Sequence, residues 1–297
     1  HQGRYDDGRA LVAQALPEVR RLGLREVEAR LLNVLAIAAE AQGQLVEALA
    51  LDRQSLQAFA EVGDRVNEAI SLANVGEGAM KLGALEAGER DLLAALQRVR
   101  ANGDLVFEAL VLGQLSTLAR WRGDAAAAQQ RAAAALANAR QAQAPDTELV
   151  ARLRVADAAL ALGQPAAAHE AYAQALALAQ TLDHGMAHDA TAGLARAARA
   201  RGAVADALVA AQPLLARGEA GGGLDGAEYP RAIEWTLAEL LHAAGDARAA
   251  SWLTRAHEAL AQQAAAIGDA AWREAFLRDI PHHRAIVAAF TARAGAG

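Results

Sequence analysis

The sequence predicts an all-α fold, a solenoid of antiparallel helix pairs that stack along the chain. The main observation is a glycine that recurs every 40 residues, at Gly3, Gly43, Gly83, Gly123 and Gly163. Gly202 and Gly245 continue the series after steps of 39 and 43 residues. A fixed period of this length is typical of repeat arrays, in which each unit buries its apolar face against its neighbours. The composition agrees, because 54% of the residues are hydrophobic, only 4% are aromatic, and the dominant alanine favours closely packed helices over a sheet.

A second glycine series indicates that each repeat contains two turns. Its members are Gly23, Gly63, Gly103, Gly223 and Gly268, with Gln143 and Asp183 in the two remaining places. Glycine is favoured just past a helix C-terminus, because that position is often left-handed. Aspartate follows directly at Asp64, Asp104 and Asp269, where it is expected to cap the next helix.

Each repeat should therefore consist of a helix A, a glycine turn, a helix B and a second turn. The expected A helices span 25–41, 64–81, 104–121, 146–162, 184–200 and 227–243. The expected B helices span 44–61, 84–101, 124–141, 164–182, 203–217 and 246–266. The glycine-rich segment 218–228 is expected to be a loop, either a plain connection or a hinge or partner-contacting loop.

The expected domain organisation is one array over residues 1–297. It begins with a partial repeat at 1–23, a helix B that contains Pro17. Complete repeats follow at 24–63, 64–103, 104–143, 144–183, 184–222 and 223–268. A C-terminal cap at 269–297 holds helices at 270–279 and 282–292, separated by Pro281, and the last helix is expected to cover the exposed face of the final repeat.

The repeats align in columns that suit closely packed helix pairs. Helix A places a large apolar residue beside a small one, at Leu35/Ala36, Val75/Gly76, Leu115/Ser116, Val155/Ala156, Leu194/Ala195 and Leu237/Ala238. Small residues also recur five positions after the turn glycine, at Ala48, Gly88, Ala128, Ala168, Ala207 and Ala250. A later small position in helix B holds Ser55, Ala95, Ala135 and Ala175. A column of Glu28, Glu68, Glu108 and Glu148 near the start of helix A is interpreted as structural, because a carboxylate offsets the helix dipole there.

These columns resemble the tetratricopeptide repeat (TPR), in the longer form found in bacterial multidomain regulators of the AfsR/LuxR-like, signal-transduction-ATPase and cyclase-associated kinds. The resemblance covers nearly the whole chain and implies a right-handed solenoid. Two features depart from the family: Ala39, Ala79, Ala119 and Ala159 stand where it has an aromatic, and no repeat ends with its usual proline. The segment 276–287 resembles the C-terminal ending of the same regulators. Because the chain also starts within a repeat and without methionine, we expect it to be the C-terminal part of a larger regulator.

Composition and motifs argue against several other classes. There is no cysteine, which excludes disulfides and thiolate chemistry. A net charge of -6 argues against direct nucleic-acid binding, and no apolar run has the length of a membrane span. His184 and His188 share a helix face, but two ligands do not complete a metal site, and the adjacent His282 and His283 are expected to serve capping or surface roles. Phosphate-loop and nucleophile-elbow motifs are missing, so we expect a cytoplasmic, non-catalytic protein without a cofactor.

The candidate binding surface is the concave face that the A helices should line. Its expected residues are Arg30, Asn33, Asn74, Glu77, Gln114, Arg120, Trp121, Arg154, Asp157, Arg196, Arg199, Trp235, Glu239 and His242. The arginines suit carboxylates and the tryptophans suit apolar anchors, although the same residues could form a solvated face.

The leading hypothesis is a module that binds a protein or peptide, or domains of its own parent chain. One alternative is a small-molecule sensor that controls an attached ATPase, cyclase or DNA-binding domain, motivated by Arg154, Arg196 and Arg199. The other is a homodimerisation scaffold, because an open array end exposes apolar surface.

Overall fold

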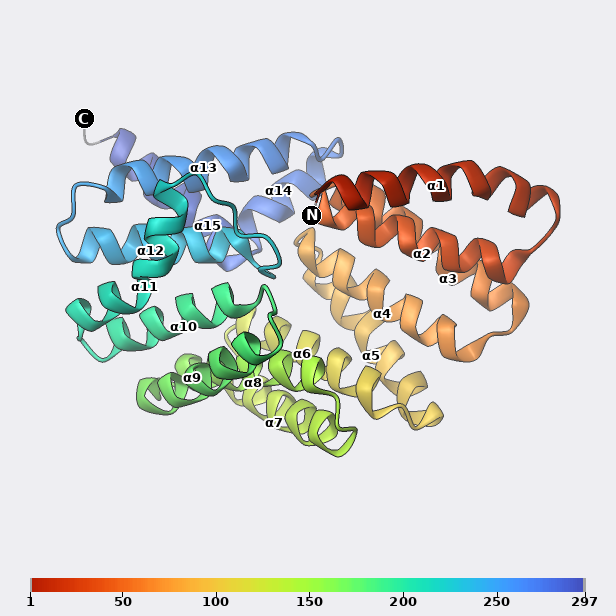
Figure 1. The fold of residues 1–297 in the computed structure, drawn as a ribbon, viewed down its shortest axis with the longest axis horizontal. Coiled ribbons are helices and arrows are strands. Elements are labelled where there is room, and N and C mark those ends of the chain that lie inside the picture. Colours follow the sequence, from red (N-terminus) through yellow and green to blue (C-terminus); the bar gives the residue numbers. More distant parts are fainter. Residues whose placement is uncertain (1, 296–297) are drawn as a thin grey trace. The chain divides into compact units, whose positions relative to one another are not determined.

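The computed structural model describes residues 2–295, and in this range the chain forms fifteen α-helices and no strand (Figure 1). The A helices are α2 (Arg25–Ala41), α4 (Arg65–Lys81), α6 (Leu105–Trp121), α8 (Pro145–Ala161), α10 (Ala187–Ala200) and α12 (Pro230–Ala243). The B helices are α1 (Gln2–Arg21), α3 (Leu45–Val62), α5 (Leu85–Asn102), α7 (Ala125–Gln141), α9 (Pro165–Thr181), α11 (Val204–Glu219) and α13 (Ala249–Ala265). The chain ends with α14 (Ala270–Arg278) and α15 (Pro281–Ala294). The helix-pair solenoid predicted from the period is therefore confirmed.

Among the described residues, no helix has the length and apolar character needed to cross a bilayer.

Most helix ends lie within one residue of the expected bounds, but three helices begin three residues later. Helix α12 is one of them, because it begins at Pro230 rather than 227, with the proline in its first turn. Helix α10 begins at Ala187 rather than 184, because His184 Nδ1 accepts the Met186 N–H at 3.1 Å and holds a turn. Helix α13 begins at Ala249 rather than 246, where Asp246 accepts the Arg248 N–H at 2.8 Å. Helix α11 continues through Gly218 to Glu219 and α12 begins at Pro230, so the glycine-rich connection is shifted and spans 220–229. The start of this segment was therefore wrongly assigned to the loop.

Most of the turns have the expected left-handed backbone geometry, including two where glycine is missing. The glycines at the first-series turns have positive φ, as Gly43 shows at 75°. In the second series, Gly23, Gly63 and Gly103 have positive φ, and Gln143 and Asp183 adopt φ of 53° and 51°, so the left-handed turn persists with other side chains. The expectation is wrong for the last two members of this series, Gly223 and Gly268, which do not have positive φ. The aspartate caps are also confirmed, because the Asp64, Asp104 and Asp269 carboxylates accept helix N–H groups at 3.1, 3.0 and 2.9 Å.

The glutamate column has a structural role that extends beyond the helix dipole. Glu28, Glu108 and Glu148 each accept from an arginine eight residues earlier, at the end of the preceding helix B. The arginine Nε to carboxylate distances are 2.7 Å for Arg20, 2.8 Å for Arg100 and 3.1 Å for Arg140. This arginine–glutamate pair, here called the clasp, therefore bridges three of the turns between repeats. Glu68 lacks the equivalent arginine, because Ala60 stands there, and instead contacts Arg98 at 3.5 Å.

The described helices form two compact units. Unit 1 contains residues up to 111 together with 263–279, and so includes α14. Helices α4 and α5 approach each other closely at Gly76 and Gly88, where an added Cβ on Gly88 would lie 2.9 Å from the Gly76 carbonyl oxygen. Helix α14 returns to the turn at Gly83, and a Cβ on this glycine would lie 2.4 Å from the Ala275 oxygen. The C-terminal segment therefore packs on an early repeat as well as following the last one.

Unit 2 contains residues 112–262 and the chain from 280 onward, and so includes α15. Small residues of helices α8 to α12 form most of its core, and Tyr172 of α9 is its largest fully buried side chain. The Tyr172 ring fills the space beside Gly193 of α10, where a Cβ would lie 2.2 Å from the ring. Helix α15 packs on α13: His257 and Phe290 stack with ring centroids 3.7 Å apart, and Arg293 donates to the Ala250 oxygen at 2.8 Å. The capping position expected for the last helix is thus observed.

Candidate binding cavity

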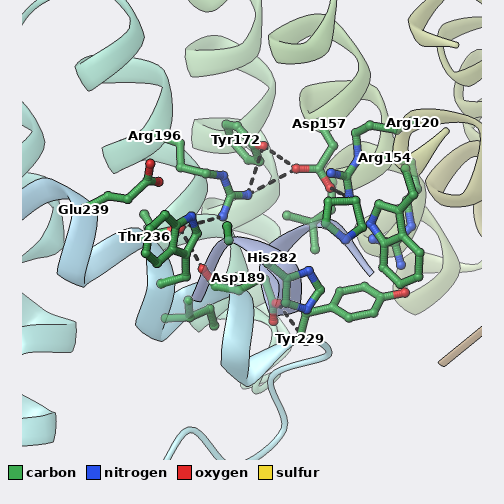
Figure 2. Close-up of a pocket in the computed structure, with 17 residues that line it drawn as sticks. Arg120, Arg154, Asp157, Tyr172, Asp189, Arg196, Tyr229, Thr236, Glu239 and His282 are labelled. Atoms are coloured by element: carbon green, nitrogen blue, oxygen red, sulfur yellow. Dashed lines mark hydrogen bonds and ion pairs between the residues drawn. The ribbon is translucent and has the colours of Figure 1, made fainter. Parts of the chain in front are cut away.

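A cavity of about 260 Å³ lies within unit 2 and is surrounded by six helices (Figure 2). Helices α6, α8, α10 and α12 are successive A helices, and α9 contributes Tyr172. The first turn of α15 forms a further wall through Pro281, His282 and Ala285. The cavity therefore collects side chains from four repeats and from the C-terminal helix.

Asp157 of α8 is the centre of a polar network in this cavity. Its carboxylate accepts from the Tyr172 hydroxyl and from Arg196 Nη2 at 3.1 Å, and Arg120 Nη2 lies 3.8 Å away. Arg196 also donates to the Tyr172 oxygen at 3.2 Å and to the Thr236 hydroxyl at 3.4 Å. The two guanidinium groups hold the pKa of Asp157 below its usual range against the opposing effect of burial, which is the largest single influence. Asp157 is therefore an anion shared by two cations.

Arg154 and Asp189 connect the cavity to the loop before α12. Arg154, whose side chain is 5% exposed, pairs with both oxygens of Glu228. Asp189 accepts the backbone N–H groups of Glu228 at 3.1 Å and Tyr229 at 3.4 Å. Burial, reinforced by the negative charge of Glu228, raises the pKa of Asp189 to about 7. The loop is thus held at its C-terminal end by side chains from α8 and α10.

Three aromatic rings form one wall of the cavity. Trp121, Tyr229 and His282 meet edge to face, with centroid distances of 5.6, 5.9 and 6.1 Å. Burial lowers the pKa of His282 well below its ordinary value, and His283 and nearby arginines act in the same direction. The His282 imidazole is therefore neutral and offers one donor and one acceptor.

Several donors in the cavity wall have no hydrogen bond to the chain. Within residues 2–295, Arg120 makes only its 3.8 Å ion pair with Asp157 and no hydrogen bond. In the same range, neither His282 nor the indole N–H of Trp235 has a hydrogen-bond partner. All three side chains line the cavity, so it offers more unused donors than acceptors.

The cavity contains half of the residues expected on the concave face. These are Arg120, Trp121, Arg154, Asp157, Arg196, Trp235 and Glu239. Arg199 lies beside them and donates to Glu239 at 3.2 Å. Gln114 is half-buried in α6 and His242 is exposed at the end of α12, and neither lines the cavity.

The other expected residues belong to unit 1. Arg30 and Asn33 lie on α2, and Asn74 and Glu77 lie on α4. Arg30 pairs with Glu26 at 2.9 Å, and Glu77 pairs with Lys81 at 2.6 Å. None of these four residues lines the cavity, and each of them is exposed or half-buried in unit 1.

Sequence reasoning missed several cavity residues and misjudged two histidines. The sequence did not predict that Tyr172, Asp189, Tyr229 and Thr236 line the cavity. Tyr172 and Asp189 belong to none of the repeating columns described above. Of the capping or surface roles expected for the histidine pair, the surface role is wrong, because His282 lines the cavity and His283 is only 5% exposed. The proline before the pair was the available signal, since Pro at the first helical position marks where α15 begins. Among the described residues, no group of three or more His, Cys, Asp or Glu side chains is placed to hold a metal ion.

Comparisons with solved structures show that the fold is a TPR-like helical repeat array. A Rap protein complexed with competence and sporulation factor superposes with a TM-score of 0.61 and 15% identity, covering 94% of this chain and 80% of that one. BtubC from P. vanneervenii superposes with a TM-score of 0.59 and 16% identity, over 73% of this chain and 91% of that one.

A third solved structure comes from a larger protein. It is a signal-transduction ATPase with a tetratricopeptide-repeat sensor from Pyrococcus horikoshii, with a TM-score of 0.53 and 18% identity, and the match covers 78% of this chain but only 36% of that one. No protein-family model matches the chain, and no curated protein matches it. Because the three structures share only 15–18% identity with this chain, the superpositions show the fold alone.

Proposed function

We propose that the chain is a non-catalytic module that binds a segment of a partner protein, and that α2 of unit 1 carries the contact surface. The observation that supports this is an exposed apolar stripe on α2. Val27, Val34 and Ile37 are 42%, 47% and 55% exposed, and their spacing places them on one helix face. Single exposed apolar residues are ordinary, but three on one face form a patch of the kind that partners cover.

The polar residues expected on the concave face flank this stripe. Arg30 is exposed and Asn33 half-buried on the same side of α2. Val34 and Ile37 stand exactly three repeats, 120 residues, before Arg154 and Asp157, which line the cavity of unit 2. Equivalent repeat positions are therefore apolar and exposed in unit 1 but charged and enclosed in unit 2. An apolar stripe with polar flanks suits an amphipathic partner segment.

Two comparisons support a peptide or protein partner. One Rap structure of the same fold is a complex with competence and sporulation factor, and another is a complex with the Phr* peptide. The match to the repeat sensor of a signal-transduction ATPase supports the finer part of the proposal, a repeat region that acts on an attached regulatory domain. Asn74 and Glu77 of α4 are proposed to extend the contact surface.

The test is selection of binders from a random-peptide phage library, followed by calorimetry with the selected synthetic peptides. We expect Ile37→Asp to weaken binding by about tenfold or more, because a charge in the buried centre of an interface must be desolvated. Val209→Asp is the matched control, since Val209 is 76% exposed on the B helix α11. If no peptide is enriched, or if selected peptides bind Ile37→Asp as tightly as the unchanged chain, the proposal is wrong.

A further inference from the structure

The cavity of unit 2 is lined in part by side chains whose hydrogen-bond donors have no partner in the described chain, a feature that the proposed partner surface on α2 does not use. Arg120, Trp235 and His282 approach it from α6, α12 and α15, and none of them has a hydrogen-bond partner within residues 2–295. Figure 2 shows the Arg120 and His282 side chains among the labelled cavity residues, together with the Arg196–Asp157–Tyr172 network. Partly buried polar groups normally find partners, so unused donors from three helices point to an acceptor that the chain does not supply.

The charges around the cavity add up to a small positive excess. Arg154 is balanced by Glu228, and Arg199 by Glu239. Asp157 is shared by Arg120 and Arg196, which leaves about one positive charge without a partner. Asp189 reduces this excess only in its ionised form, and burial raises its pKa to about 7. The first turn of α15 adds the positive end of a helix dipole beside His282.

The remaining walls are apolar or aromatic. Leu153, Ile233 and Ala285 contribute aliphatic surface, and the rings of Trp121 and Tyr229 stand edge to face. A volume of about 260 Å³ lies just below the usual range for small-molecule pockets, roughly 300–1,000 Å³, and suits a ring with one short acidic arm better than a peptide segment.

We propose that this cavity binds a small monocarboxylic acid with an apolar, preferably aromatic, body. In this arrangement the carboxylate accepts from the planar donors of Arg120 and from His282 or Trp235. The body contacts Leu153, Ile233 and the aromatic wall. One guanidinium in excess suits a monoanion, because a doubly charged phosphate would bring a second negative charge close to Asp157 and Glu239 without a matching cation. The site is separate from the α2 stripe, so either proposal can fail alone.

The experiment is isothermal titration of the full chain with phenylacetate, with the neutral isostere phenylacetamide as the matched ligand. We expect phenylacetate to bind with a Kd of about 1 mM or tighter, and phenylacetamide about tenfold or more weakly, because only the acid can use the uncompensated guanidinium. Binding of both ligands with equal affinity, or of neither at millimolar concentration, would overturn the proposal.

Variants then locate the site. Arg120→Gln should weaken phenylacetate binding by about tenfold or more. Arg201→Gln should leave it unchanged, since Arg201 is an exposed arginine at the end of α10 and its loss changes the net charge equally. Trp235→Phe removes the indole N–H and replaces the indole with a smaller phenyl ring, so the cavity wall stays aromatic. It tests the site if Arg120→Gln fails to fold, and it should also weaken binding. Equal affinity in the folded cavity variants and in Arg201→Gln would exclude this cavity as the site.

Ile37→Asp should bind phenylacetate with unchanged affinity, so failure of the peptide experiment and failure of this one can be told apart.

Discussion

Asp189 illustrates how burial changes the chemistry of a single residue. Its carboxylate holds two backbone N–H groups of the loop before α12, while Arg154 and Arg196 face it as cations and Glu228 as an anion. Burial outweighs the favourable contacts, and the pKa rises from 3.8 to about 7. Asp52 of unit 1 behaves in the same way, with a pKa of about 7 that results from burial and from Glu40 and Glu77. These carboxyl groups are therefore protonated in the folded chain under conditions where the unfolded chain ionises them.

The pH dependence of stability follows from this difference. Below pH 3.8 both states of the chain bind the Asp189 proton, but between 3.8 and about 7 only the folded state retains it. The contribution of Asp189 to the free energy of unfolding should therefore fall as pH rises through this window, by roughly 1.4 kcal/mol for each unit of pKa shift.

The measurement compares urea unfolding of the unchanged chain with that of Asp189→Asn at several pH values between 4 and 8. The variant cannot ionise, so it should gain stability relative to the unchanged chain as pH rises. Asp52 contributes equally to both proteins and cancels in the comparison. Parallel pH profiles for the two proteins would contradict a raised pKa at Asp189.

At the scale of the helix, the arginine–glutamate clasp links each helix B to the next helix A. The arginine precedes the glutamate by eight residues, which places the two side chains on either side of a left-handed turn. The arginines are about half exposed, so each pair should contribute little individually. The pair nevertheless recurs at three turns. The glutamates of this column therefore form an ion pair with the preceding helix as well as offsetting the dipole of their own helix.

The missing clasp gives a prediction of increased stability. Ala60 is exposed and occupies the arginine position before Glu68. Ala60→Arg should raise the free energy of unfolding by about 0.2–1 kcal/mol at low salt, and about 1 M salt should remove most of the gain by screening. Chemical denaturation at both salt concentrations checks this, with Ala60→Gln as a neutral control of similar length. A gain that persists at high salt, or an equal gain in Ala60→Gln, would show that packing rather than the ion pair is responsible.

At the scale of the whole molecule, the chain is not organised strictly by nearest neighbours. The segment 263–279 belongs to the same compact unit as the first repeats, although more than 150 residues separate them in sequence. Helix α14 contacts the turn at Gly83, and Phe276 on this helix is fully buried. Within unit 1, this long-range contact adds to the local contacts that normally dominate a repeat array.

Alanine substitutions at two turn glycines can distinguish the free-energy cost of backbone strain from the cost of losing the contact between α14 and the turn at Gly83. Gly83 and Gly123 have φ of 82° and 84°, so alanine at either position should cost about 1–2 kcal/mol in left-handed strain. A Cβ at Gly83 would also lie 2.4 Å from the Ala275 oxygen, whereas a Cβ at Gly123 would meet nothing within 4 Å. Gly83→Ala should therefore lose more stability than Gly123→Ala, and amide hydrogen exchange over 270–278 should become faster only in Gly83→Ala. Equal losses and unchanged exchange in both variants would show that α14 does not depend on this contact.

How far the structure could be predicted depends on whether the physical cause is local. The period, the turn glycines, the aspartate caps and the small-residue columns act within one helix pair, and they predicted the helices to within a few residues. The positions of Arg120, Arg154, Asp157 and Arg196 on the A helices also follow from the repeat, so part of the cavity was predictable. His282, Asp189 and Tyr172 were not, because their environment depends on where α15, the loop before α12 and Gly193 lie in space.

Local patterns along the chain are enough to predict an all-helical array of about six repeats with a capped C-terminus, because backbone conformation and pairing of adjacent helices depend on neighbouring residues. It also determined that equivalent positions of the A helices change from Val34 and Ile37 to Arg154 and Asp157. Only the tertiary structure decided that the charged positions enclose a cavity of about 260 Å³ while the apolar ones remain exposed. The physical reason is that enclosure requires walls from residues far apart in the chain: the first turn of α15 meets Trp121 across 161 positions of sequence, and no repeat pattern encodes that contact.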